Sequence, residues 1–210
     1  MENAADIFHT NMLRVRTLGG LYGALSNLIT GAVDPSDILR AQIVLVVSAL
    51  DHYVHQISFL GIQQVLDGLR PSTRSFLSLK VSMESVMGSW ASPGTSDRLL
   101  DEIRERHSYL SFQKPESIAE AVRLFSDVSF WSEVGKKLSQ PEVDVKNRLT
   151  LIVDRRNKIA HEADMDPSYP GARWPISESD VEATLEFVED LCEAIDFVVR
   201  GQDVSHFKVQ

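Results

Sequence analysis

Apolar residues recur every three to four positions along most of the chain, which is the period of an α-helix. Short segments rich in proline, glycine or serine interrupt this pattern, and no segment alternates apolar and polar residues as a half-buried strand requires. The pattern therefore predicts an all-α helical bundle without a sheet. The expected helices cover residues 2–29, 36–66, 72–88, 96–111, 116–125, 130–138, 142–163 and 178–200.

The helix predicted over 36–66 is apolar on nearly every side in its first half, which indicates a place at the centre of the bundle. Its richest apolar run, "AQIVLVVSAL" at 41–50, is shorter than the roughly 18 residues that a membrane span needs. The sequence thus predicts a core helix and no membrane segment.

The final predicted helix, 178–200, carries a regular apolar stripe that we expect to be buried. At its start, Ser179 and Glu182 have the spacing of a capping box, in which each side chain satisfies a free backbone N–H of the first turn. The stripe consists of Val181, Leu185, Val188, Cys192, Ile195 and Val199.

The helix predicted over 142–163 has an arginine in its apolar stripe. On an ideal helix, Arg156 lies at the centre of the direction shared by the apolar residues. An unpaired buried guanidinium costs several kcal/mol, so the stripe must open onto a cleft or Arg156 must pair with an acid such as Asp51 or Asp154. The apolar residues of the stripe are Val145, Leu149, Ile152, Ile159 and Ala163.

Two further polar residues follow Arg156 on the same helix. Asn157 and His161 are four positions apart and share one face, whereas Arg156 and His161 are five apart and diverge by about 140° on an ideal helix. One straight helix therefore does not bring all three groups to one atom, but two such helices facing each other across a symmetric cleft would.

The segment "RRNKIAH" resembles the Arg-x4–6-His motif of the HEPN superfamily of helical ribonucleases. The longer run "VDRRNKIAHEADMDPSYPGARWPI" is similar to the RiboL-PSP-type branch, in which a proline-rich loop follows the motif; here that loop is 164–176. The resemblance implies one HEPN-like domain over 1–210, with extra helices inserted between the second helix and the motif helix.

The resemblance also implies metal-independent cleavage of RNA at a composite site in a homodimer, with no cofactor. The RNA 2′-OH would attack the adjacent phosphate and leave a 2′,3′-cyclic phosphate and a 5′-OH. His161 would move protons, Arg156 would stabilise the phosphate charge, and Asn157 would orient the phosphate or His161. Arg155 and Lys158 are candidates for binding the RNA strand, although they point away from Arg156 on the ideal helix.

A second match to the motif spacing runs from Arg200 to His206, just after the expected end of the last helix at Gly201. It lacks the asparagine that follows the arginine, and it does not lie in the middle of a helix. We therefore interpret it as a chance match.

The formal net charge is −9, which argues against a generic nucleic-acid coat protein because such proteins bind through a basic surface. The strongest positive segment is 146–158, where five basic residues accompany one acid. The charge is compatible with an enzyme that handles RNA at one local basic site. It also leaves open a non-catalytic HEPN-like module that binds RNA or a partner protein.

The other histidines favour structural interpretations. His52 and His55 lie near Asp51, but no glutamate stands three residues before any histidine, so the Glu-x-x-His pattern of a helical di-metal site is missing. We expect His107 to be solvated on a charged helix.

The single cysteine, Cys192, excludes an internal disulfide, and the acidic N-terminus does not resemble a secretory signal. A cytoplasmic protein is expected. The resemblance implies a toxin or antiviral defence effector, with an antitoxin or another defence-system protein as a possible partner.

Overall fold

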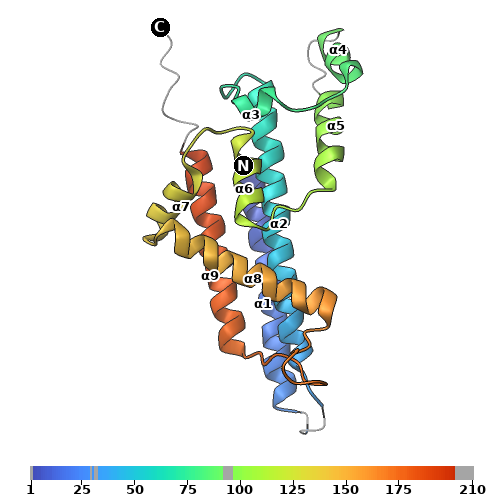
Figure 1. The fold of residues 1–210 in the computed structure, drawn as a ribbon, viewed down its shortest axis with the longest axis vertical. Helices are drawn as coiled ribbons and strands as arrows, with labels where there is room; N and C mark the ends of the chain where they lie inside the picture. The colour runs from blue at the N-terminus through green and yellow to red at the C-terminus, as the bar shows by residue number, and fades with distance from the viewer. Residues whose placement is uncertain (1, 29, 31–32, 92–96, 202–210) are drawn as a thin grey trace.

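The computed structural model describes residues 2–28, 30, 33–91 and 97–201, and within these ranges the protein is all-α, as the periodicity predicted (Figure 1). The only β-type pairing in these ranges is an isolated antiparallel bridge between Met165 and Arg173. The helices are α1 (Glu2–Ser26), α2 (Ser36–Leu66), α3 (Arg74–Leu77), α4 (Met83–Ala91), α5 (Asp97–Ser108), α6 (Pro115–Arg123), α7 (Phe130–Leu138), α8 (Glu142–Glu162) and α9 (Glu178–Arg200).

The central helix of the bundle is α2, as its composition predicted. It packs against α1, α5, α6, α8 and α9 and runs antiparallel to α1 (Figure 1). Leu50, Val54 and Ile57 on α2 are fully buried. By length and composition alone α2 is apolar enough to cross a membrane, but half of its most apolar window is buried inside the protein, which is typical of a core helix.

The last helix, α9, buries the whole predicted stripe from Val181 to Val199. The predicted capping box at Ser179 is wrong, because the helix begins two residues earlier than that box requires. Ser177 is the N-cap, and its hydroxyl accepts a hydrogen bond from the backbone N–H of Asp180 at 3.2 Å. Since an N-cap side chain bonds the N–H two or three residues ahead, Ser177 and not Ser179 defines the start.

The predicted helix over 72–88 is two helices, α3 and α4. Thr73 caps α3 by accepting from the N–H of Phe76 at 3.0 Å, and the Ser82 hydroxyl accepts from the N–H of Ser85 at 3.2 Å at the start of α4. Hydroxyl side chains that cap nearby N–H groups compete with a continuous helix, and the apolar period does not reveal this competition.

Helices α3 to α7 lie between α2 and α8 in the chain, where the sequence predicted additional helices. α5 lies beside the upper half of α2, with α4 at its far end (Figure 1). A small second core of Ile62, Leu100 and Ile103 joins α5 to α2. α6 and α7 pack on the main core instead, where Phe130 and Val134 of α7 are buried.

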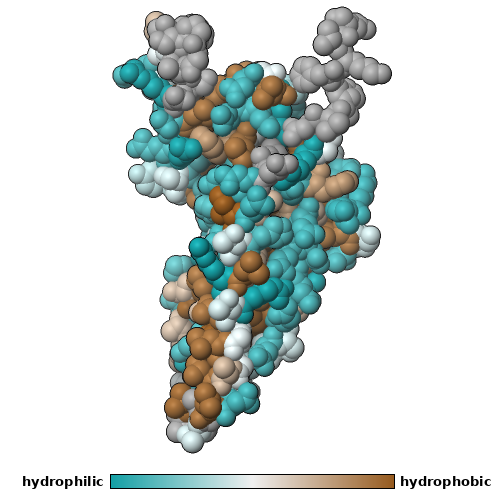
Figure 2. All heavy atoms as spheres, turned by 180° about the vertical axis from the view of Figure 1, so that it is seen from behind, coloured by the Kyte–Doolittle hydropathy of each residue, from teal (hydrophilic) through white to brown (hydrophobic). Residues whose placement is uncertain are grey.

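The reverse face of the protein carries apolar side chains along its narrow lower end, where α1 ends and α2 begins (Figure 2). The exposed large apolar residues near the end of α1 and the start of α2 include Leu21, Leu28 and Val33. The lower end of the bundle therefore has an exposed apolar surface.

Candidate active site

The motif residues lie on the second half of α8, a helix of 21 residues that crosses in front of α2 and α9 (Figure 1). Acids in the first turn, Glu142 and Asp144, and His161 in the last turn match the helix dipole. Its buried residues are Val145, Leu149, Ile152 and Val153. The core contact is thus concentrated in the first half of α8, and the motif half is less covered.

The predicted stripe is partly wrong beyond Val153. Ile159 is only half-buried, and Ala163 is exposed because it lies past the last helical residue, with a φ of 51°. Arg156 is half-buried rather than enclosed by apolar side chains. The stripe opens toward solvent where the motif begins, so the alternative of a fully buried Arg156 is wrong.

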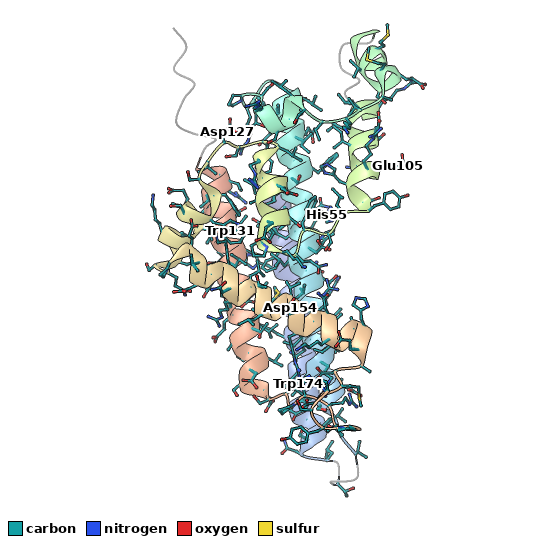
Figure 3. The ribbon with its side chains drawn as sticks, viewed as in Figure 1. His55, Glu105, Asp127, Trp131, Asp154 and Trp174 are labelled. Carbon is teal, nitrogen blue, oxygen red and sulfur yellow. The ribbon has the colours of Figure 1, made fainter. Side chains whose placement is uncertain are left out.

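Arg156 forms no hydrogen bond or ion pair with any part of the chain that the structure describes. Asp51, one acid suggested for it, instead accepts from the N–H of Phe112 at 2.6 Å and from the Gln113 amide at 2.9 Å. Asp154, the other, is exposed on α8 (Figure 3). The Arg156 guanidinium is therefore available to an external anion.

Asn157 is half-buried and His161 is exposed, and the helix between them is unbroken. They share a face one turn apart, while Arg156 and His161 remain five positions apart on a regular helix. The divergence inferred from the sequence therefore holds, and one chain does not converge the three groups. His206 of the second motif match lies outside the described residues.

Arg155, next to the motif arginine, is half-buried and pairs with an acid. Its Nη1 lies 2.7 Å from Oδ1 of Asp164, a residue with no exposed side chain. Nη2 donates to Oδ2 of Asp164 at 2.9 Å and to the Pro175 carbonyl at 3.1 Å. Burial lowers the pKa of Arg155 while Asp164 raises it, and the nearby Arg40 lowers it further.

Arg40 of α2 binds the same carboxylate. Its Nε donates to Oδ2 of Asp164 at 2.7 Å, and its Nη2 donates to the Trp174 carbonyl at 2.9 Å. Only 6% of Arg40 is exposed, so this guanidinium is the deeply buried cation near the motif. We call Arg40, Arg155 and Asp164 the arginine clamp.

Asp164 also fixes the backbone at the end of α8. Its N–H donates to the Lys158 carbonyl at 3.0 Å, and its carbonyl accepts from the N–H of Trp174 at 2.9 Å. Ala163 and Asp164 both have positive φ, at 51° and 59°, which turns the chain sharply after Glu162. One residue thus connects the motif helix, the end of the following loop and α2.

The loop 164–176 packs against the motif helix. Asp166 and Ala172 join its two sides through an N–H to carbonyl bond of 2.9 Å. Trp174 is half-buried, and the Lys158 ammonium lies 5.1 Å from its ring centroid (Figure 3). At the tip Tyr169 is exposed.

Arg155 and Lys158, the two predicted RNA-binding residues, therefore differ in their surroundings. Arg155 is held in the arginine clamp, which favours a structural role, whereas Lys158 is half-buried on the surface of Trp174. Arg40 and Asp164 were not predicted from the sequence to lie near the motif. The available signal was an arginine directly before the apolar run 41–50, which is the same anomaly that drew attention to Arg156.

Among the described residues, no group of three or more histidine, cysteine, aspartate or glutamate side chains is arranged to hold a metal ion. The groups present at the motif are a guanidinium, a carboxamide, an imidazole and an ammonium. They can bind a phosphate and move a proton.

An all-helical fold with an Arg-Asn-x-x-x-His motif on a partly exposed half-helix matches the HEPN type of protein. The sequence model described as RiboL-PSP-HEPN matches residues 24–199, most of the chain, and the protein belongs to this family. Membership supports an RNA-related function of the HEPN type. No curated protein and no solved structure matches the chain.

Proposed function

We propose that the protein is a metal-independent endoribonuclease that acts as a homodimer. The observation that carries the proposal is the Arg156 guanidinium, which lies half-buried beside Asn157 and has no partner among the described residues. A guanidinium that extends from a regular helix and has no neutralising carboxylate is suited to bind a phosphate. Membership of the RiboL-PSP-HEPN family supports RNA as the source of that phosphate.

In the proposed reaction the RNA 2′-oxygen bonds to the adjacent phosphorus while the bond from phosphorus to the 5′-oxygen breaks. His161 of one chain accepts the proton of the 2′-OH, and His161 of the second chain donates a proton to the departing 5′-oxygen. Arg156 stabilises the negative charge of the pentacoordinate phosphate, and Asn157 orients it. Lys158 binds a neighbouring phosphate of the strand. The products are a 2′,3′-cyclic phosphate and a 5′-OH.

The homodimer follows from the divergence of Arg156 and His161 on α8. Facing copies of this half-helix would place the arginine of one chain near the histidine of the other. A protein that remains monomeric while it cleaves RNA would contradict this part of the proposal.

The test is to incubate labelled RNA with the purified protein in EDTA and to compare wild type with His161→Ala. Chelator-resistant cleavage by wild type that His161→Ala abolishes is the expected result. His52→Ala is the matched control, because His52 is also an exposed helical histidine but lies outside the motif. Equal behaviour of wild type and His161→Ala would contradict the proposal.

The second candidate function is a non-catalytic HEPN-like dimer that binds RNA or a partner protein, which the net charge of −9 favours. This second candidate predicts that the protein binds RNA without cleaving it in the same experiment.

For the ribonuclease, we propose a role as a cytoplasmic toxin or antiviral defence effector, restrained by an antitoxin or another defence-system protein.

A further inference from the structure

A small pocket lies between α2 and α5, on two helices that the proposed cleavage does not use. It has a volume of about 270 Å³. Figure 3 labels His55 on α2, on the side that faces α5. Each helix contributes residues spaced three or four apart, which share one face. The lining residues are His55, Gln56, Phe59, Arg104, His107 and Ser108.

The lining contains no carboxylate, although the chain has 30 acidic residues and a net charge of −9. Asp51 is close to His55, at 3.8 Å, but its oxygens accept from Phe112 and Gln113. Asp101 lies 3.6 Å from Arg104 and is mostly exposed. Glu105 points away from α2 (Figure 3). The lining thus has one cation, Arg104, two imidazoles and no carboxylate, on a protein that is acidic overall.

Arg104 lies over Phe59, with its guanidinium carbon 3.9 Å from the ring centroid. Stacking on one face leaves the second face and the N–H edge of the guanidinium open, and the side chain is 62% exposed. A guanidinium plane of this kind stacks on nucleobases, while its edge binds phosphate oxygens.

His107 is half-buried and not solvated, contrary to the sequence-based expectation. His55 and His107 both contact the Phe112 ring, with centroid distances of 4.5 and 5.9 Å. Burial and the nearby His55 lower the pKa of His107. An anion between the two imidazoles would offset both effects, because it favours their charged forms.

We propose that this pocket binds one nucleotide, with its phosphate against Arg104 and His107 and its base stacked on the open face of Arg104. Gln56 supplies its amide and Ser108 supplies a hydroxyl oxygen as an acceptor for the base or the ribose, since the Ser108 hydroxyl already donates to the Glu105 carbonyl at 2.6 Å. The volume lies just below the range of about 300–1,000 Å³ typical of small-molecule sites, so it suits a single nucleotide. The nucleotide comes either from an RNA strand or from a free mononucleotide.

The test measures binding and is independent of cleavage. Adenosine 5′-monophosphate, adenosine and inorganic phosphate are titrated into the full-length protein, and the imidazole NMR resonances of His55 and His107 are followed. The monophosphate is expected to shift both resonances at millimolar concentration and to bind more tightly than adenosine or phosphate. Arg104→Gln is expected to weaken its binding about tenfold or more, since a charge-assisted hydrogen bond is lost.

Arg106→Gln is the matched control, because Arg106 is on the same helix but pairs with Glu102 at 2.7 Å and does not line the pocket. It should leave binding unchanged. Equal weakening by the two variants, equal affinity for inorganic phosphate, or no shift with the monophosphate would each overturn the inference.

A short oligoadenylate added to the His161→Ala protein distinguishes the two sources. Tighter binding than the monophosphate, lost in the additional Arg104→Gln variant, supports an RNA strand. Equal or weaker binding supports a free nucleotide. If RNA is cleaved but the monophosphate does not bind, this inference fails while the proposed ribonuclease stands. If the monophosphate binds but RNA is not cleaved, the proposed ribonuclease fails while this inference stands.

Discussion

The half-buried Arg155 and the fully buried Asp164 form an ion pair of 2.7 Å beside the motif residues Arg156 and His161. The pair joins the side chain that precedes the motif arginine to the residue that ends the motif helix. Arg40 completes the arginine clamp from α2. Charged groups therefore help to set the position of the motif relative to the core, because the buried apolar residues of α8 end at Val153 and the half-buried Ile159 packs on the core beyond it.

Asp164→Asn should destabilise the fold, because it removes the buried carboxylate that neutralises the buried Arg40 and the half-buried Arg155. Removal of one partner of a buried pair costs about 3–5 kcal/mol. The free energy of unfolding in urea measures the loss. Asp37→Asn is the control, since Asp37 is 66% exposed and pairs with Arg173 and Arg40 at the surface. It should cost about 1 kcal/mol or less, and similar losses for both variants would contradict the clamp.

Ala163→Gly should stabilise the protein by about 1 kcal/mol, because Ala163 has a φ of 51° and glycine adopts this conformation without the steric cost of a Cβ atom. Ala160→Gly, three residues earlier and exposed within α8, should destabilise it by about 1 kcal/mol. Thermal or urea unfolding of the two variants gives the comparison. A loss of stability in Ala163→Gly would show that the left-handed turn is wrong.

Gly61→Ala should be strongly destabilising. A Cβ atom at Gly61 would lie 2.2 Å from the ring of Phe125, which is fully buried. Overpacking of this kind costs about 1–3 kcal/mol or more. Gly20→Ala on α1 meets no atom within 4 Å and should stabilise the protein by about 0.5–1 kcal/mol. The midpoints of urea unfolding test the opposite signs, and a neutral Gly61→Ala would refute the close approach of α2 to Phe125.

The helical period predicted the fold class, the central place of α2 and the buried face of α9, because burial against a core imposes that period directly. It did not predict the break between α3 and α4 or the cap at Ser177. These depend on single hydrogen bonds between hydroxyls and backbone N–H groups, for which several nearby serines compete.

The motif residues were found from the sequence, but their surroundings were only partly predicted. The spacing placed Arg156, Asn157 and His161 on one helix. It did not show that the neighbouring Arg155 is neutralised by Asp164, since that contact depends on the turn at Ala163. The spacing also did not show that Arg40 binds Asp164, because the two residues are 124 positions apart in sequence. The pocket between α2 and α5 was missed for the same reason.

The chemical identity of the RNA ends tests the central claim most directly. RNA incubated with the protein in EDTA is predicted to yield fragments that carry 2′,3′-cyclic phosphate and 5′-OH ends, while RNA with 2′-O-methyl groups at every position stays intact. Mass spectrometry of the fragments distinguishes these ends from others. Fragments with 5′-phosphate ends, or cleavage of the fully methylated strand, would contradict attack by the 2′-oxygen at the Arg156 and His161 site.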